Sequence, residues 1–384
     1  DWIIEVVVEK LDIKKSVFDL VEKHRKTGTI ITSNTSGIPI KLMNEGRSDD
    51  FKECFAITHF FNPPRYLNLF EVVPGPDCKK EILDFLLDYG EKFLGKTSVL
   101  AKDTPAFIGN RIGIFGIMSL FHQIKSGEYS VEEVDKLTGP AIGRPKSATF
   151  RTADIAGLDT MCHVANGVYE KCKDDESREV FKLPDFLQKM LDSNMLGSKT
   201  GKGFYKKIKD DNGKSKILAL DLNTFKYNEQ KKVSYETLKN ARKCKKRDEK
   251  FKTLINGNDK ASEFYKENFA RMFGYIQNRI PEISNDITSI DAALKTGFGW
   301  KDGPFEIWNY IGVKEGVELM KKFDLKPAEW INEMIKKNTN NFYRINDGFR
   351  EYYDINSNSF NKIAGQDGFV ILKNTPENKV IWSN

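Results

Sequence analysis

Apolar and polar residues along the first hundred positions follow a pattern of short strands joined by an amphipathic helix. Residues 2–8 (WIIEVVV) and 29–32 (TIIT) are apolar, β-branched runs typical of buried strands. Between them apolar residues recur at the spacing of one helix face, and Gly28 predicts the end of that helix. The strand–helix–strand order predicts a parallel sheet, with ligands at the carboxyl ends of its strands.

Two further strands are predicted on either side of a proline-rich break. Residues 54–60 (CFAITHF) and 67–73 (LNLFEVV) are the apolar runs, and an antiparallel return between them places His59 opposite Glu71. A carboxylate in an apolar strand is costly unless it is paired, and a paired histidine is a general base whose partner fixes its tautomer. On spacing alone, two buried polar residues satisfied by the backbone are the alternative interpretation.

After these strands the pattern becomes helical. Asp103 or Thr104 is predicted to cap a helix that has Pro105 in its first turn. Apolar residues cover nearly the whole circumference of this helix, so we expect it to be buried in a helical domain. Asn110 lies near its start, where a buried asparagine is either a structural hydrogen-bond partner or a substrate contact.

Three polar segments interrupt the helical patterns. The charge run at 173–179 (KDDESRE) is predicted to be solvated, and residues 210–213 (DDNG) are predicted to form a hairpin turn. Residues 238–252 (LKNARKCKKRDEKFK) are strongly basic and mark a linker region. Such a run is most often a solvated helix face, and binding of a CoA phosphate or an anionic partner is the alternative.

The helical pattern occurs twice, at an offset of about 155 residues. Three pairs of segments match. The S-V-E-E-V-D segment that begins at Ser130 matches the D-I-T-S-I-D segment that begins at Asp286, and Gly143 matches Gly299. The motif Phe150-x3-Asp154-x2-Gly157 matches Phe305-x3-Asn309-x2-Gly312. The same offset carries Asn110 to Lys266, so the second copy lacks the asparagine. We therefore expect a structural second copy and not a second active site.

Composition narrows the classes of function. A chain of 384 residues predicts two or three domains, and no apolar run approaches the length of a membrane span. The five cysteines show no metal or disulfide spacing, which favours a reducing cytoplasm. The net charge of +6 suits anionic small molecules and does not by itself indicate nucleic acid. No G-x-G-x-x-G motif occurs, and the glycine cluster at 197–203 lacks both that spacing and the P-loop spacing.

Four motifs in a fixed order carry a resemblance to a known family. They are Ser33-Asn34-Thr35-Ser36 after a strand, H-F-F-N-P from His59, the E-V-V strand from Glu71, and K-D-T-P-x-F-x-x-N-R from Lys102 to Arg111. With them the chain resembles the 3-hydroxyacyl-CoA dehydrogenase family, closely over residues 1 to about 206 and more weakly over 259–384. The resemblance implies NAD-dependent oxidation of a (3S)-3-hydroxyacyl-CoA to the 3-ketoacyl-CoA in fatty-acid β-oxidation.

The resemblance also implies roles for single residues. His59 would take the hydroxyl proton as hydride leaves C3, while Glu71 would hold the other ring nitrogen and stabilise the imidazolium. Ser36 and Asn110 would bind the oxygens of the substrate. The candidates for cofactor binding are Glu5, near the nicotinamide ribose, Asn34 and Asn62. For Glu5, an exposed charge at the end of a strand is the alternative.

Four segments follow from the motifs and the repeat. Residues 1–101 are predicted to be the C-terminal half of a Rossmann-type NAD-binding domain, 102–206 a first all-α domain of the family's C-terminal type, 207–258 a hairpin and basic linker, and 259–384 a second all-α domain. In the resembled family the glycine loop lies upstream of the position of Asp1. We therefore expect the chain to be N-terminally incomplete and, by itself, to bind NADH weakly or not at all.

The tandem copies predict an internal assembly. The resembled dehydrogenases are dimers of this domain, so we expect either a monomer with an internal pseudo-dimer or a homodimer. The Gly299–Phe305 loop and the helix after it, with apolar Phe305, Ile307, Trp308 and Ile311, are predicted to pack on the first copy. A flexibly tethered second copy is the alternative.

The loops at 144–154 and 299–306 resemble those of bacterial fatty-oxidation multifunctional proteins, in which an enoyl-CoA hydratase domain adjoins the dehydrogenase. The expected partners are therefore an acyl-CoA substrate and a hydratase domain or a thiolase. Two other functions stay open. One is a dehydrogenase of a hydroxy acid without CoA, and the other is a non-catalytic assembly module that docks a hydratase or thiolase.

Overall fold

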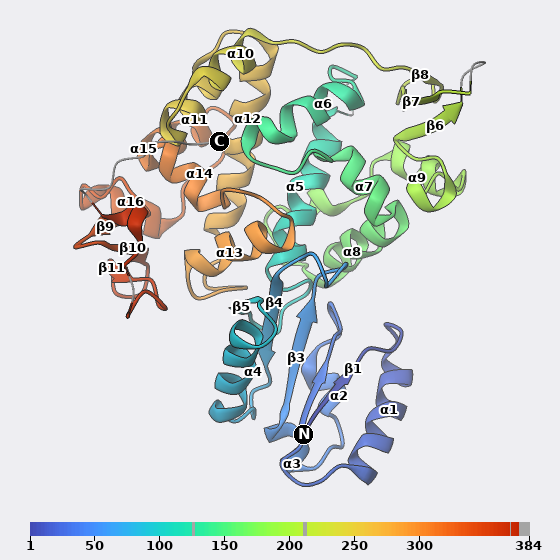
Figure 1. Cartoon of the computed structure of the whole chain (residues 1–384), viewed down its shortest axis with the longest axis vertical. Coiled ribbons are helices and arrows are strands. Elements are labelled where there is room, and N and C mark those ends of the chain that lie inside the picture. Colours follow the sequence, from blue (N-terminus) through green and yellow to red (C-terminus); the bar gives the residue numbers. More distant parts are fainter. Residues whose placement is uncertain (125–126, 210–212, 369, 376–384) are drawn as a thin grey trace.

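The computed structural model describes residues 1–124, 127–209, 213–368 and 370–375. An α/β unit formed by the first hundred residues lies at one end of the molecule, and a larger, mainly helical body lies at the other (Figure 1). The expected DDNG turn falls largely outside the described residues, since 210–212 are not among them. The two strands that flank the turn pair antiparallel, as a hairpin requires.

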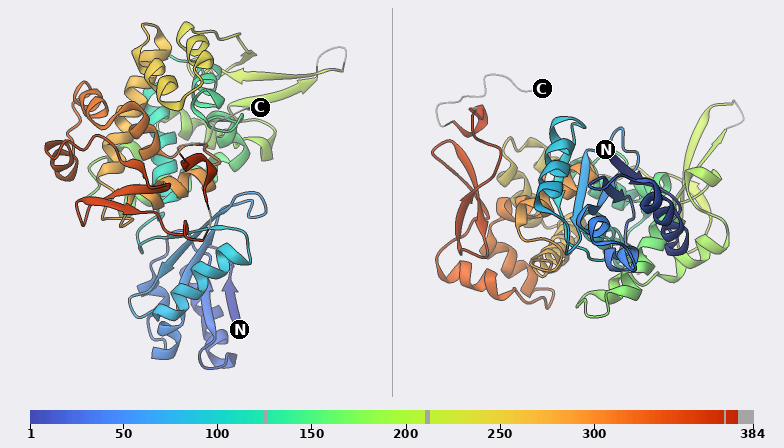
Figure 2. Two further views of the ribbon diagram at one scale, coloured as in Figure 1. Left: turned by 60° about the vertical axis from the view of Figure 1, so that its left-hand side comes forward. Right: turned by 90° about the horizontal axis from the view of Figure 1, so that it is seen from below.

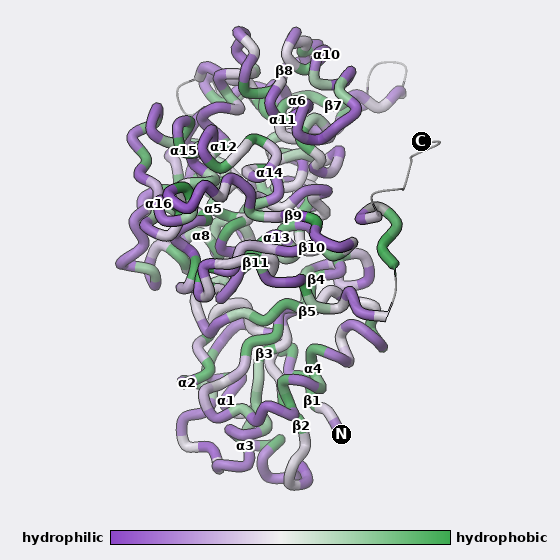
Figure 3. Tube along the Cα trace, turned by 90° about the vertical axis from the view of Figure 1, so that its left-hand side faces the viewer, coloured by the Kyte–Doolittle hydropathy of each residue, from purple (hydrophilic) through white to green (hydrophobic). Residues whose placement is uncertain are grey.

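The α/β unit is a five-stranded mixed sheet with its strands in sequence order. The strands are β1 (Trp2–Glu5), β2 (Ile30–Ser33), β3 (Phe55–Phe60), β4 (Leu69–Pro74) and β5 (Thr97–Leu100). Strands β1, β2 and β3 pair in parallel, as predicted, and β4 pairs in parallel with β5. Strand β4 runs antiparallel to β3, which confirms the return and sets His59 opposite Glu71. Figure 3 shows hydrophobic residues along β3 and β4, in keeping with their burial.

Four helices accompany this sheet among the described residues. They are α1 (Leu11–His24), α2 (Ile40–Asn44), α3 (Asp49–Glu53) and α4 (Lys80–Lys92). The predicted helix between the first two strands is α1, whose Phe18 packs edge-on against Phe51 and Phe55. Strand β1 is shorter than predicted and ends at Glu5, because Val6 and the two residues after it leave the ladder and are exposed.

The helix after β5 begins later than the sequence predicts. Helix α5 (Gly109–Ile124) starts at Gly109 and not beside Pro105. The carboxylate of Asp103 caps a different element, accepting a hydrogen bond from the backbone N–H of Ile40 over 2.9 Å. Ala106 and Phe107 have φ values of +66° and +47°, in the left-handed region that no α-helix can contain. The burial of α5 on nearly all sides is confirmed.

The helical body consists of two copies with the same order of elements. The first contains α5, α6 (Val131–Thr138), α7 (Phe150–Ala156), α8 (Leu158–Lys171), α9 (Asp185–Asp192), β6 (Tyr205–Lys209), β7 (Ser215–Leu220) and β8 (Tyr227–Glu229). The second contains α12 (Lys260–Gln277), α13 (Ile287–Gly297), α14 (Pro304–Ile311), α15 (Val313–Lys321), α16 (Glu329–Lys336), β9 (Tyr343–Asn346), β10 (Phe349–Asp354) and β11 (Ser359–Lys362). The prediction of an all-α second domain is therefore wrong, since β9, β10 and β11 form a three-stranded antiparallel sheet.

The two small sheets, β6 to β8 and β9 to β11, lie on opposite sides of the helical body (Figure 2).

Equivalent carboxylates join helices to the small sheet in each copy. Asp135 accepts the backbone N–H of Phe150 and the hydroxyl of Tyr205, over 2.7 and 2.8 Å. Asp291 accepts the backbone N–H of Phe305 and the hydroxyl of Tyr343, over 2.8 and 2.7 Å. Burial raises the pKa of Asp135 to about 6 and that of Asp291 well above its usual range. The repeat thus extends beyond the matched motifs and includes the sheet that ends each copy.

The basic run between the copies is folded. It forms α10 (Glu236–Lys243) and α11 (Arg247–Asn256), and α11 buries Phe251 and Leu254 against the second copy. The linker region is therefore helical and packs on the second copy, which counts against the alternative of a flexibly tethered second copy. Their lysine and arginine side chains are mostly exposed, as expected of a solvated helix face.

The two copies contact each other through equivalent loops. The backbone N–H of Lys301 donates to the carbonyl of Gly143 over 2.8 Å, and the Arg144 guanidinium lies 3.9 Å from the centre of the Trp300 ring. The expected contact of the 299–305 loop with the first copy is present at this point. The apolar face of α14 packs elsewhere: Phe305 and Trp308 contact aromatic rings of the second copy itself.

A glycine on α5 permits the close approach of the second copy. A Cβ atom on Gly113 would lie 2.1 Å from the tip of the Phe298 ring, which is itself held between Phe61 and Trp300. We expect Gly113→Ala to lower the free energy of unfolding by about 1–3 kcal/mol, because the ring must move in a packed interface. The measurement is urea unfolding of the purified protein.

Gly167 provides the matched control for this prediction. It also lies inside a helix, α8, but nothing lies within 4 Å of an added Cβ. Gly167→Ala should leave the stability unchanged or raise it by up to about 1 kcal/mol, since alanine is the better helix former. Equal unfolding midpoints for Gly113→Ala and Gly167→Ala would contradict the close packing.

Candidate active site

Strands β3 and β4 place a histidine and a glutamate side by side at the junction between the sheet and α5. The distance between His59 Nδ1 and Glu71 Oε2 is 2.7 Å. Both side chains are buried, with exposed fractions of 6% for His59 and 0% for Glu71. The rings of Phe61 and Phe107 lie edge-on to the imidazole, with centroids 5.0 and 5.5 Å away. The two polar residues therefore pair with each other, in a largely apolar surrounding.

The second oxygen of the glutamate is held by the start of α5. Glu71 Oε1 accepts the backbone N–H groups of Ile108 and Gly109, over 3.0 and 2.8 Å. Free N–H groups at the amino end of a helix stabilise negative charge. The left-handed turn at Ala106 and Phe107 precedes these groups directly, and such backbone strain is common at functional sites. The carboxylate is thus fixed on both sides.

The pairing assigns the protons of the imidazole. A carboxylate only accepts hydrogen bonds, so Nδ1 of His59 carries the proton that points at Glu71. In the neutral ring, Nε2 then holds the lone pair. This arrangement supplies a proton acceptor whose orientation is fixed by its partner, which is what general-base chemistry requires.

The two predicted substrate contacts lie on the segments that flank the turn before α5. Ser36 belongs to the loop after β2, which lies against the turn before α5, since a Cβ on Gly37 would be 3.8 Å from the N atom of Ala106. Asn110 lies in the first turn of α5. Both residues are half-buried, and within the described part of the chain neither side chain has a hydrogen-bond partner. Their polar groups are therefore available to a ligand.

Two of the three predicted cofactor contacts, Asn34 and Asn62, have polar groups that, within the described part of the chain, are free to bind a ligand. Asn34 follows β2, and its Oδ1 accepts the backbone N–H of Phe60 over 2.9 Å, which leaves its amide N–H groups unused. Asn62 is exposed at the end of β3. Both lie at the carboxyl edge of the strands, where the strand–helix–strand order predicts ligands.

Glu5 is neither exposed nor free. Its carboxylate accepts the backbone N–H of Val7, the hydroxyl of Ser33 and the ammonium of Lys14, which contacts both oxygens over 2.9 Å. These contacts fill the acceptor positions of a carboxylate. The interpretation of Glu5 as an exposed charge is wrong. A ribose contact stays a prediction and requires one of these bonds to exchange.

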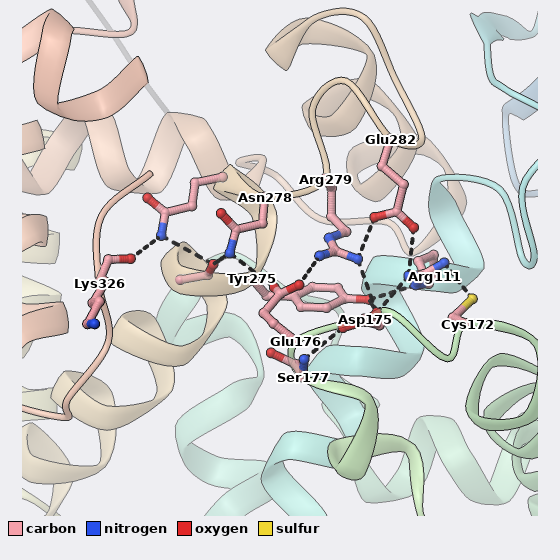
Figure 4. A network of polar contacts seen from close by, with 12 residues as sticks. Arg111, Cys172, Asp175, Glu176, Ser177, Tyr275, Asn278, Arg279, Glu282 and Lys326 are labelled. Atoms are coloured by element: carbon pink, nitrogen blue, oxygen red, sulfur yellow. Dashed lines mark hydrogen bonds and ion pairs between the residues drawn. The ribbon is translucent and has the colours of Figure 1, made fainter. Parts of the chain in front are cut away.

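A buried ion-pair network behind the site was missed from the sequence. Figure 4 shows it around Arg111, whose guanidinium donates to Asp175, Tyr275 and Glu282 over 2.6, 2.7 and 2.9 Å. Arg279 adds a second cation to Asp175 over 3.1 Å. The prediction that residues 173–179 are solvated is therefore wrong for Asp175, whose side chain is fully buried. The sequence does contain one indication of this network: Arg111 ends the N-R motif on a helix that is otherwise mostly apolar. A buried cation of this kind requires carboxylate partners elsewhere in the chain.

A large cleft lies at the other end of the first copy. Its volume is about 990 Å³, and it lies between α6, α7, β7 and the segment that leads to α10. Six cationic side chains line it: Lys136, Lys146, Arg151, Lys231, Lys232 and Arg242. None of them forms an ion pair within the described residues. Glu132 and Asp135 also line the cleft, and of the basic run 238–252 only Arg242 reaches it, so anion binding by that run stays an untested alternative.

All five cysteines are free thiols.

Within the described ranges, no helix is both long and apolar enough to cross a bilayer.

Comparison with known proteins gives two family matches. The profile described as "3-hydroxyacyl-CoA dehydrogenase, NAD binding domain" matches residues 1–104. The profile described as "3-hydroxyacyl-CoA dehydrogenase, C-terminal domain" matches residues 107–207.

Curated relatives match over most of this chain. A "Probable 3-hydroxyacyl-CoA dehydrogenase" of Bacillus subtilis is 48% identical over 354 residues, which cover 92% of this chain and 44% of the relative. A "Putative fatty acid oxidation complex trifunctional enzyme" of Rickettsia prowazekii is 29% identical over 383 residues, covering 98% of this chain and 49% of the relative. The chain thus spans about half the length of these two relatives.

Two solved structures share the fold over most of the chain. A 3-hydroxybutyryl-CoA dehydrogenase from Escherichia coli K12 has a TM-score of 0.65 at 18% identity, covering 88% of this chain and 81% of its own. The dehydrogenase part of multifunctional enzyme 1 from C. elegans has a TM-score of 0.51 at 21% identity, covering 87% and 71%. At these identities the likeness concerns the fold alone.

Proposed function

Because the chain belongs to the 3-hydroxyacyl-CoA dehydrogenase family, we propose that it carries the catalytic groups for NAD-dependent oxidation of (3S)-3-hydroxyacyl-CoA to 3-ketoacyl-CoA in fatty-acid β-oxidation. The observation that carries the proposal is the 2.7 Å contact between His59 and Glu71. A buried imidazole with one nitrogen held by a carboxylate is suited to remove a hydroxyl proton.

His59 and Glu71 have distinct roles in the proposed reaction. Nε2 of His59 accepts the proton of the C3 hydroxyl while the C–H bond at C3 breaks and its electron pair leaves as hydride. Glu71 keeps the ring oriented and balances the charge of the imidazolium that forms. The helix N–H groups of Ile108 and Gly109 hold Glu71 in place through this step.

Ser36 and Asn110 are the proposed substrate ligands. Their side chains lack partners within the described residues and lie on the loop and the helix start that meet beside the dyad. A hydroxyl and an amide can donate to the C3 oxygen and the thioester oxygen. Such contacts would fix C3 relative to His59, which is the positional requirement for proton transfer.

The polar residues at the carboxyl edge of the sheet are suited to bind the nicotinamide end of the cofactor. Asn34 retains unused amide donors and Asn62 is exposed at the same edge of the sheet, while Glu5 is saturated by its own partners. When bound, NAD would supply the acceptor for the hydride from C3. Asn34 and Asn62 are the residues that would hold its nicotinamide end.

A place in a larger fatty-acid oxidation assembly is part of the proposal. It is supported by the Rickettsia relative, whose description is a trifunctional enzyme of such a complex. The chemistry points the same way, because the hydroxyl substrate arises by hydration of an enoyl-CoA and the keto product is the substrate of a thiolase. A hydratase domain or a thiolase is therefore the proposed partner.

The test is a comparison of substrates with the native protein and NAD. We expect (3S)-3-hydroxyacyl-CoA esters to have kcat/KM values at least about tenfold above those of the free 3-hydroxy acids of equal length, because remote binding energy is lost with CoA. Equal kcat/KM values would favour a dehydrogenase of hydroxy acids without CoA. Absence of all turnover, together with normal binding of a hydratase or thiolase, would favour an assembly module.

A further inference from the structure

The second copy meets the first at the helix start that carries the site. Tyr275 is at the end of α12, and Arg279 and Glu282 follow it. All three contact Arg111 or its partner Asp175, and the ring of Tyr275 stacks on Phe115 of α5 with 3.7 Å between the centroids. Figure 4 shows these side chains converging from the two copies.

The tyrosine is central to this network. Its hydroxyl accepts the Nε–H of Arg111 over 2.7 Å and donates to Asp175 over 2.9 Å. Burial raises the pKa of Tyr275 well above its usual value, so the hydroxyl keeps its proton and can serve both bonds. The guanidinium of Arg111 also donates to Cys172 Sγ over 3.0 Å. A planar guanidinium with four directed partners has one orientation, which fixes the rotation of the helix that bears it.

The same turn of α5 faces the dyad on its other side. Arg111 is the neighbour of Asn110, and Gly109 donates its N–H to Glu71, which holds His59. Ile108, Gly109, Asn110 and Arg111 thus lie between the second copy and the general base. A rotation of this turn would move Asn110 and both N–H groups that hold Glu71.

We propose that the second copy, which lacks the equivalent asparagine, serves the reaction as a positioning element, and that Tyr275 with Arg279 sets the orientation of Asn110 and of the His59–Glu71 pair through Arg111. Buried ion pairs often contribute little net stability, because desolvation offsets their attraction, and in some proteins their role is to specify geometry. Tyr275 and Arg279 touch neither substrate nor cofactor in this arrangement, so they are positioning residues. The kinetic part of the proposal rests on the proposed function.

The test uses Tyr275→Phe with Tyr265→Phe as its matched control, in the native protein. Both tyrosines are buried on α12, and both hydroxyls bond to the first copy, Tyr265 donating to the carbonyl of Leu137 over 2.7 Å. Each variant loses one hydroxyl across the same interface. Only Tyr275→Phe should speed amide hydrogen exchange at Ile108 and Gly109, by roughly tenfold or more.

The kinetic readout separates positioning from stability. Tyr275→Phe should lower kcat roughly ten- to a hundredfold with a smaller change in KM, since misplacement by about 1 Å can cost that much. In a protein that already carries His59→Gln, adding Tyr275→Phe should lower kcat very little, because the group being positioned is then absent. Tyr265→Phe should keep the kcat of the parent protein.

Each outcome decides between the claims. Unchanged exchange at Ile108 and Gly109 overturns the proposal, whatever the activity. Faster exchange with an unchanged kcat also overturns it. If the unmodified protein oxidises no 3-hydroxyacyl-CoA, the proposed function fails, while the exchange experiment still decides whether the second copy fixes α5. If Tyr275→Phe does not fold, Glu282→Gln at the half-exposed partner of Arg111 replaces it, with the same outcomes expected.

Discussion

Replacement of His59 by glutamine is expected to lower kcat for acyl-CoA oxidation by about 10²–10⁴-fold, the usual contribution of a general base. Glutamine preserves a polar side chain of similar reach but has no nitrogen lone pair that can accept a proton. The affinity for the acyl-CoA should change little, because the proposed substrate ligands Ser36 and Asn110 remain in place. Steady-state kinetics and acyl-CoA titration of the native protein provide the two measurements.

His163 supplies the control histidine. It is exposed on α8, in the first copy, and has no hydrogen-bond partner within the described residues. His163→Gln should keep the kcat of the parent protein. A kcat for His59→Gln within threefold of the parent would remove the base assignment.

Replacement of Glu71 by glutamine is expected to lower kcat by a similar factor, about 10²–10⁴-fold, although the shape of the side chain is retained. The helix N–H groups of Ile108 and Gly109 require an oxygen at the Oε1 position. The amide NH₂ of the glutamine must then face Nδ1 of His59, which can no longer donate. The ring proton moves to Nε2, and the lone pair needed for the reaction is lost from the side that faces the substrate.

A double replacement tests whether the two residues act as a unit. His59→Gln combined with Glu71→Gln should be about as slow as either single variant, since both changes remove the same function. Glu91→Gln, on the exposed surface of α4, is the control for the loss of one carboxylate. Multiplicative losses in the double variant would show that Glu71 acts by another route.

The pairing of His59 with Glu71 could be predicted because successive side chains of a strand point to opposite faces of the sheet, so the apolar pattern allows few registers. Once the proline-rich break defines the return between β3 and β4, the register follows from the apolar pattern of both strands. The two helical copies were also predictable, since their caps and glycines recur in order. These features depend on residues that are close in sequence or repeated along it.

The features that escaped prediction depend on distant partners. Asp175 lies in a segment as charged as any solvated loop, and only the presence of Arg111 and Arg279 makes its burial possible. The late start of α5 reflects left-handed φ values at Ala106 and Phe107, which neither alanine nor phenylalanine favours. In the second small sheet, β10 (FREYYD) and β11 (SFNK) contain many polar residues and lack the alternation that marks a half-buried strand, and β9 alternates over only four residues.

The contact between Arg144 and Trp300 has a consequence for how this molecule can evolve. The two residues follow the equivalent glycines 143 and 299, and one lies directly over the other. In a symmetric dimer of identical chains, a residue beside the two-fold axis meets its own duplicate, and one mutation alters both sides at once. Such a dimer could bring together two arginines or two tryptophans at this point, but never one of each. Gene duplication within a single chain lets the two halves diverge, and so makes available complementary pairs that a homodimer cannot encode.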